Sequence, residues 1–226
     1  MKFISISGAD ACGKDTQIDR LEKYFVKLGK KTQILSLDSS LKHFEEVLTH
    51  EQIADVHSIL LLQFEPLART LFLQSLIKNA LDQIKPDTQI VIFNGYWYKF
   101  AASEAAYGVP LTFWTNSASD LFPKPDVSIH LQVPIETCFK RRRLWTPYEM
   151  GHGRYWGTPP LSFESFQTKV HEQFLQLFQP LQIPVIQIDG DHPEEQVARN
   201  ISSLFDESPI PKSSELVLSS SSDLLL

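Results

Sequence analysis

The sequence predicts an α/β fold in which a five-stranded parallel sheet lies between two layers of helices. Five short segments are apolar or rich in β-branched residues, as buried parallel strands require. Amphipathic helical patterns separate them, and this alternation is typical of a doubly wound sheet. The predicted strands are residues 3–7, 32–37, 89–93, 127–133 and 185–188.

Apolar spacing and end signals define the helices between the strands. Gly29 is expected to cap the first helix, and Pro193 is expected to open the last one. Pro66 lies inside the apolar stretch 53–81 and should kink or split that helix. The inward-facing stripes are Ile18, Leu21, Phe25 and Leu28; Phe163, Phe166, Val170, Phe174 and Leu177; and Val197, Ile201 and Leu204.

Length and composition fit one domain, residues 1–205, followed by a tail. Residues 206–226, "DESPIPKSSELVLSSSSDLLL", are rich in Ser and Pro, which predicts disorder; a short partner-binding motif is the alternative. The net charge of -6 disfavours nonspecific nucleic-acid binding. Two cysteines without metal or redox spacing, no signal peptide and no membrane-length apolar run predict a cytoplasmic location.

The stretch "SISGADACGKDTQ" contains a phosphate-loop motif, Gly8-x-x-x-x-Gly13-Lys14, between a predicted strand and a predicted helix. Backbone N–H groups of such a loop surround phosphates, and Lys14 would reach the β- and γ-phosphates of ATP. The alternative is a glycine-containing turn without a ligand. The candidate ATP-binding residues are Gly8, Ala9, Asp10, Ala11, Cys12, Gly13, Lys14, Asp15 and Thr16.

Asp15 departs from this motif, because a Ser or Thr hydroxyl at that position normally binds Mg²⁺. A carboxylate is also a good Mg²⁺ ligand, although it adds negative charge beside the phosphates. Thr16 follows directly and is the other candidate for the hydroxyl ligand. The sequence therefore predicts a Mg²⁺ site at Asp15 or Thr16.

The loop and the rest of residues 3–205 resemble the thymidylate kinase family, which are nucleoside monophosphate kinases with a P-loop NTPase fold and a lid segment. Lys14, Thr16 and Gln17 match the family's loop, whereas Asp15 does not. Asp10 matches the loop carboxylate, and the resemblance implies that it lies near the sugar of the acceptor nucleotide.

The segment "LLLQFEPLARTLFLQSLIKNAL" is similar to the family's helix whose arginine contacts the pyrimidine base. Arg69 occupies the arginine position, and Phe64 offers an aromatic face one residue out of register. An arginine on an apolar helix needs an anionic or acceptor partner if it is buried. The alternative is a surface arginine whose stem covers apolar neighbours.

The segment "VIFNGYWYKFAASEAAYG" resembles the family's Asp-Arg-Tyr signature only in its second half, at Ser103 and Tyr107. One alignment places Lys99 at the signature's arginine, and another places Asn94 at its aspartate. Both alignments lack the carboxylate, and lysine lacks the bidentate fork of arginine. The resemblance implies that Lys99 holds the acceptor phosphate; a structural loop packed with aromatic residues is the alternative.

The segment "CFKRRRLWTPYEMGHGRYWG" gathers cations where the family has its lid, here approximately residues 141–160. Because Ala11 occupies the phosphate-loop position of a catalytic arginine, the resemblance assigns catalysis to the lid. A solvated charge run is the alternative. The candidate catalytic residues are Lys14, Arg141, Arg142, Arg143 and Arg154.

The resemblance implies transfer of the γ-phosphoryl group of ATP to dTMP, with Mg²⁺, in dTTP synthesis. Substrates would be small nucleotides, and the apolar region 53–81 would support a homodimer. Two alternatives are a kinase for a different nucleotide or nucleoside and a nucleotide-binding protein without turnover. The altered signature favours these alternatives, and the retained Lys14 and lid arginines favour the kinase.

Overall fold

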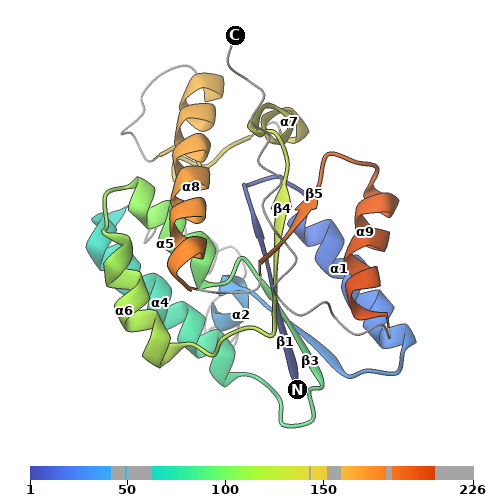
Figure 1. Cartoon of the computed structure of the whole chain (residues 1–226). Helices are drawn as coiled ribbons and strands as arrows, with labels where there is room; N and C mark the ends of the chain where they lie inside the picture. The colour runs from blue at the N-terminus through green and yellow to red at the C-terminus, as the bar shows by residue number, and fades with distance from the viewer. Residues whose placement is uncertain (42–48, 50–62, 143, 152–158, 182–184, 207–226) are drawn as a thin grey trace.

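The computed structural model describes residues 1–41, 49, 63–142, 144–151, 159–181 and 185–206 (Figure 1). Its sheet has five parallel strands in the order β2-β3-β1-β4-β5, which confirms the predicted sheet. The strands are β1 (Lys2–Gly8), β2 (Thr32–Leu35), β3 (Ile90–Asn94), β4 (Val127–Gln132) and β5 (Val185–Asp189).

The alternation of side chains along the central strands divides the interior into two cores. On β1, Phe3 belongs to one core, whereas Ile4 and Ile6 belong to the other. On β3, Phe93 and Ile92 separate in the same way. Every one of these side chains is at most 4% exposed, so both faces of the sheet are covered by helices.

Helices cover the two faces unequally. On one face lie α1 (Lys14–Lys27) and α9 (Glu194–Ser202), and the opposite face carries a larger group of helices (Figure 1). That group is α4 (Pro66–Asp82), α5 (Trp97–Ala106), α6 (Leu111–Leu121) and α8 (Pro159–Leu181). Two short helices, α2 (Leu37–Leu41) and α7 (Ile135–Arg141), follow β2 and β4. The three-layer α/β/α arrangement is confirmed.

The end signals that glycine and proline provide are confirmed at two helices. Gly29 follows α1 with a φ of 71°, and Pro193 is the residue before α9. Of the two predicted effects of Pro66, the kink is wrong and a break fits the described residues. Pro66 is the first residue of α4, where its missing N–H has no cost, and Phe64 and Glu65 before it are not helical. Its predicted partner stretch 53–62 lies outside the described residues.

Some boundaries and burial predictions were wrong. The second strand ends at Leu35 rather than at residue 37, because Leu37 begins α2. Leu28 is 55% exposed, since α1 ends at Lys27 and the stripe ends with it. The aromatic-rich segment after β3 is the helix α5 rather than a loop. Within the described residues, no helix combines the length and apolarity that crossing a membrane requires.

Candidate active site

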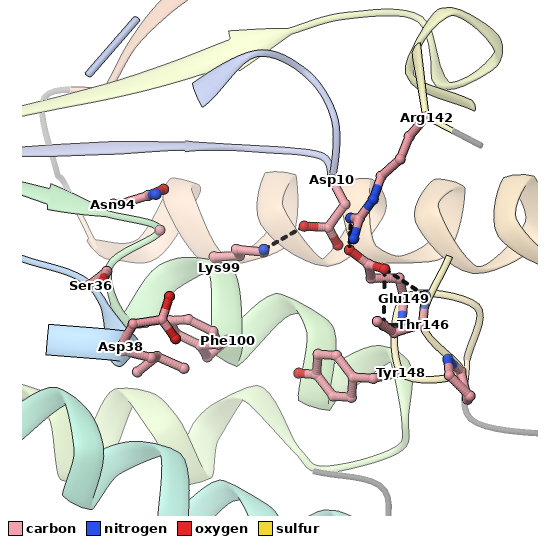
Figure 2. A pocket seen from close by; sticks show the side chains of 13 residues that line it. Asp10, Ser36, Asp38, Asn94, Lys99, Phe100, Arg142, Thr146, Tyr148 and Glu149 are labelled. Atoms are coloured by element: carbon pink, nitrogen blue, oxygen red, sulfur yellow. Dashed lines mark hydrogen bonds and ion pairs between the residues drawn. The ribbon is translucent and has the colours of Figure 1, made fainter. Parts of the chain in front are cut away.

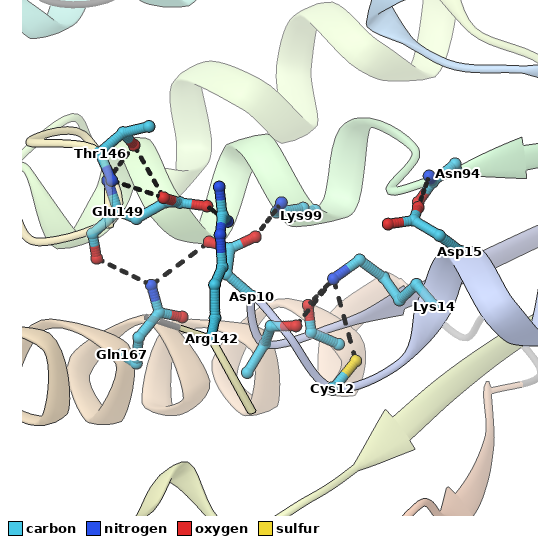
Figure 3. Close-up of polar contacts among 12 residues, drawn as sticks. Asp10, Cys12, Lys14, Asp15, Asn94, Lys99, Arg142, Thr146, Glu149 and Gln167 are labelled. Carbon is cyan, nitrogen blue, oxygen red and sulfur yellow. Dashed lines mark hydrogen bonds and ion pairs between the residues drawn. The ribbon is translucent and has the colours of Figure 1, made fainter. Parts of the chain in front are cut away.

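The phosphate loop connects β1 to α1 at the carboxyl end of the central strand (Figure 3). Gly8 and Gly13 have φ of 148° and 97°, values that a side chain disfavours. A Cβ at Gly8 would lie 2.7 Å from the Leu131 carbonyl oxygen, so the turn also needs glycine for space. The loop therefore reaches the N-terminus of α1, whose backbone N–H groups and dipole favour a bound anion.

The Lys14 ammonium lies inside the loop and is nearly buried, with 7% of the residue exposed. It donates to the carbonyl oxygens of Gly8 at 3.1 Å and Ala9 at 2.7 Å. Burial lowers the pKa of Lys14, but Cys12, Asp10 and Asp15 outweigh burial and raise it above the ordinary value. The loop thus holds a fixed positive charge where a phosphate would sit.

Asp15 and Thr16 are exposed in the first turn of α1. The Asn94 side-chain amide at the end of β3 donates to Asp15 Oδ1 at 2.6 Å, which orients the carboxylate (Figure 3). A carboxylate and a hydroxyl are the oxygen ligands that Mg²⁺ prefers. In the described part of the chain no three acidic, His or Cys side chains form a metal cluster. The donor set fits a Mg²⁺ ion that is held partly by nucleotide phosphates.

A cavity of about 510 Å³ opens beside the loop, and charged side chains of both signs line it (Figure 2). Lys99 of α5 and Asp10 of the loop form an ion pair at 2.5 Å. Burial raises the pKa of Asp10, but the ammonium groups of Lys99 and Lys14 outweigh it, so the pKa is below its ordinary value. The lining residues are Asp10, Ser36, Leu37, Asp38, Asn94, Gly95, Lys99, Phe100, Arg142, Thr146, Pro147, Tyr148 and Glu149.

A second, more polar cavity of about 270 Å³ is lined by Cys12 and Gly13 of the loop, Thr16 of α1, Arg141 and the segment after β5. Arg141 donates to the carbonyl oxygens of Cys12 at 3.2 Å and Gly190 at 3.3 Å. Arg142 directly follows α7 and is extended, with φ −132° and ψ 141°. The side chains of these consecutive arginines therefore diverge, and each lines a different cavity.

Comparison with known proteins agrees with this geometry. The family model "Thymidylate kinase" matches residues 6–201, which is most of the chain. The chain belongs to the thymidylate kinase family. It is 29% identical over 140 residues to "Probable thymidylate kinase 1" of Saccharolobus solfataricus, covering 62% of this chain and 69% of that protein. It is 24% identical over 192 residues to "Thymidylate kinase" of Caldanaerobacter subterraneus, covering 84% and 87%.

The residue aligned with the family's base-contacting arginine lies in the protein interior. Arg69 is 0% exposed and forms a bidentate ion pair with Glu104 of α5, at 2.8 and 3.0 Å. Its guanidinium lies 4.2 Å from the centre of the Tyr107 ring and 5.2 Å from that of Tyr148. Burial raises the pKa of Glu104, and the Arg69 charge opposes that shift. The surface-arginine alternative is wrong.

The structure brings together only some of the candidate acceptor residues. Asp10, Asn94 and Lys99 line the larger cavity. Phe64 packs edge-on against Phe72, and the Phe64 carbonyl accepts from Arg69 at 3.2 Å. Phe64 and Arg69, with the buried Ser103 and Tyr107, are absent from the described lining of that cavity, which includes the aromatic residues Phe100 and Tyr148. Their role toward the acceptor stays a prediction.

Several residues of the site were not found from the sequence, and four of them hold other site residues in place. Glu104 pairs with Arg69 and accepts a hydrogen bond from Tyr148. Gln167 donates both to the Glu149 carbonyl oxygen, in the turn region 144–151, and to Asp10 of the phosphate loop. Glu104 has one signal, since it is the lone acid of a helix that is otherwise apolar apart from Lys99 and Ser103. The pattern Thr146-x-x-Glu149 is a capping-box sequence, and Gln167 gives no signal.

Arg143 and Arg154 lie outside the described residues, as does segment 152–158. The described part of the predicted lid consists of Arg141 and Arg142, the turn region 144–151 and the start of α8.

Proposed function

We propose that the protein transfers the γ-phosphoryl group of ATP to dTMP, giving dTDP for dTTP synthesis. One observation carries the proposal: the phosphate loop lines two separate cavities, and each cavity has its own arginine from the end of α7. Phosphoryl transfer between two nucleotides needs two sites that meet at one phosphate-binding centre. Membership of the thymidylate kinase family supports dTMP as the acceptor.

The donor nucleotide is assigned to the smaller cavity and the loop. Lys14 would exchange the carbonyl oxygens of Gly8 and Ala9 for β- and γ-phosphate oxygens, so its charge is already placed for the transferred group. Backbone N–H groups at the start of α1 would bind the same phosphates. Arg141 would neutralise donor phosphates from the cavity it lines. Residues 8–16 together form the proposed ATP site.

Asp15 and Thr16 would hold Mg²⁺, with Asn94 keeping the Asp15 carboxylate in place. When bound, Mg²⁺ supplies charge neutralisation between the phosphates. The exposed position of both side chains leaves them accessible to a nucleotide-bound ion.

The acceptor nucleotide is assigned to the larger cavity. Lys99 and Arg142 are its cations, and they would hold the acceptor phosphate in line with the donor. Asp10 remains ionised because of its low pKa, so it accepts a hydrogen bond from a sugar hydroxyl rather than donating one. Arg143 and Arg154 are further candidates for the transition-state charge, and Arg69 with Phe64 for the base.

A specific observation favours a second candidate, a kinase for a different nucleotide. Glu104 accepts from Nε and Nη2 of Arg69, the Phe64 carbonyl accepts from Nη1, and Asp38 places a carboxylate at the larger cavity instead. A carboxylate accepts from amino and imide groups of bases, so it does not by itself select thymine. The acceptor identity therefore needs direct measurement.

The test measures ADP release with Mg-ATP against dTMP, dUMP, UMP, CMP, dAMP, dGMP and thymidine, with Lys14→Ala as control. Turnover restricted to dTMP and lost in the variant is the expected result. Turnover with another acceptor would support the second candidate. ATP binding without turnover on any acceptor would contradict both kinase proposals and leave a nucleotide-binding protein.

Four further features stay predictions. Leu67 and Leu71 on α4 are 52% and 55% exposed, which supports a homodimer through this helix; light scattering would test it. A cytoplasmic location is supported by the buried free cysteines. A lid at approximately 141–160 and a disordered tail at 206–226 would both be tested by limited proteolysis with and without nucleotide.

A further inference from the structure

The larger cavity contains an unusual balance of charge. Its two cations are each bonded to a carboxylate that lines the same cavity. Lys99 pairs with Asp10, and Arg142 pairs with Glu149 at 2.5 Å (Figure 3). A phosphate that enters this cavity meets cations that already have anionic partners.

The Arg142–Glu149 pair is asymmetric. The Glu149 side chain is 13% exposed, whereas that of Arg142 is 45% exposed. The second carboxylate oxygen of Glu149 accepts from the Thr146 backbone N–H at 2.8 Å and from its hydroxyl at 2.9 Å. Glu149 is thus fixed by its own turn, and Arg142 is the partner with room to leave.

Glu149 is also fixed relative to the phosphate loop. Gln167 of α8 donates to the Glu149 carbonyl oxygen at 3.1 Å and to Asp10 Oδ2 at 3.4 Å (Figure 3). Asp10 in turn holds Lys99. One network therefore connects both cation–carboxylate pairs of the cavity, which keeps Glu149 beside the place where the acceptor phosphate would bind.

We propose that Glu149 is an internal competitor of the acceptor phosphate, occupying the Arg142 guanidinium until a phosphate replaces it. This inference rests on the proposed function for the identity of the acceptor, but its chemistry concerns any phosphate monoester. Glu149 Oε1 holds Nη1 of Arg142. A phosphate that binds the Nη1–Nη2 edge of this guanidinium must therefore displace Glu149 from Nη1. Glu149 thereby sets the affinity of the site for the acceptor phosphate.

The capping-box role of Glu149 makes a clean substitution available. In Glu149→Gln, the side-chain carbonyl oxygen still accepts from Thr146, while the charge that competes for Arg142 is removed. The matched control is Glu136→Gln on α7. Glu136 pairs with Lys140 at 2.6 Å, is 73% exposed and is absent from the described lining of the larger cavity.

The experiment titrates dTMP by calorimetry into each protein saturated with a nonhydrolysable Mg-ATP analogue, and measures the KM for dTMP and kcat. Glu149→Gln should lower the Kd and the KM for dTMP about five-fold without raising kcat. This ratio corresponds to ~1 kcal/mol, the contribution of a partly exposed ion pair. Glu136→Gln should match the wild type. A Kd for Glu149→Gln equal to or above the wild-type value would overturn the proposal.

A second arm separates this proposal from the proposed function. Inorganic phosphate is titrated against thermal unfolding of the same analogue-saturated proteins, and a binding constant is taken from the shift in Tm. If dTMP binds none of the proteins but phosphate binds Glu149→Gln more tightly than the wild type, the internal competitor stands and dTMP is the wrong acceptor. Equal phosphate binding by Glu149→Gln and the wild type would overturn the competitor itself.

Discussion

Removal of one partner from the Arg69–Glu104 pair should destabilise the protein strongly. Both side chains are 0% exposed, and the pair has two N–O contacts at 2.8 and 3.0 Å. Tyr148 also donates to Glu104, at 3.0 Å. Arg69→Met leaves a buried carboxylate without its cation, and Glu104→Leu leaves a buried guanidinium without its anion. Each change should cost about 3–5 kcal/mol in the free energy of unfolding.

The double variant Arg69→Met/Glu104→Leu should recover most of that loss. Replacing a buried ion pair by apolar side chains of similar volume is often neutral, so the double variant should lie within ~1–2 kcal/mol of the wild type. Urea denaturation of all four proteins at pH 7.5 gives the coupling energy directly. Single-variant losses below about 1 kcal/mol would refute the reasoning, because such values belong to solvated pairs.

The same double variant tests the predicted base contact of Arg69. Because it should remain folded, its KM for dTMP reports the contribution of Arg69 to acceptor binding rather than to stability. An unchanged KM would mean that Arg69 does not contact the base. A raised KM at unchanged stability would support the contact that the family resemblance implies.

Three further predictions concern the loop and the sheet. Gly8→Ala should cost at least ~2 kcal/mol in unfolding free energy and abolish ATP binding by calorimetry, because its Cβ would meet the Leu131 carbonyl oxygen at 2.7 Å with φ at +148°. Asn94→Asp should weaken ATP binding roughly ten-fold without Mg²⁺, and less with it, since a carboxylate would replace the amide that donates to Asp15 at 2.6 Å. Burial lowers the pKa of His130 to about 3, so below pH 6.5 the unfolded chain takes up a proton that the folded one does not. From pH 7 to 5 the wild type should therefore lose about 2 kcal/mol more than His130→Asn by urea denaturation.

The sheet and the loop were predictable because their signals are local. The Gly8–Lys14 motif and the five buried strands are each recognisable from short stretches of sequence, and the structure confirms a sheet of five parallel strands. Boundaries failed where tertiary packing decides them. Leu37 begins α2 and packs in the same core as Phe3 and Phe93, although residues 32–37 read as one strand in the sequence.

The charged network was not predictable, because its partners are distant in sequence. Arg69 and Glu104 are 35 residues apart, and Lys99 and Asp10 are 89 apart. The amino-acid sequence shows an arginine on an apolar helix, but it does not show which carboxylate of another helix neutralises that arginine. The divergence of Arg141 and Arg142 likewise depends on backbone angles at the end of α7.

Among the residues that the structure describes, the cations assigned to substrate already have partners in the protein. Lys14 has loop carbonyls, Lys99 has Asp10, and Arg142 has Glu149. Nucleotide binding would then replace the protein partners of these cations by phosphate oxygens. The affinity would be the difference between the bonds gained to the nucleotide and the bonds lost within the protein. Fewer counterions would be released than the number of cations implies, since those cations are neutralised beforehand. The salt dependence of dTMP affinity should consequently be steeper in Glu149→Gln than in the wild type, because Arg142 would meet the phosphate without an internal anion.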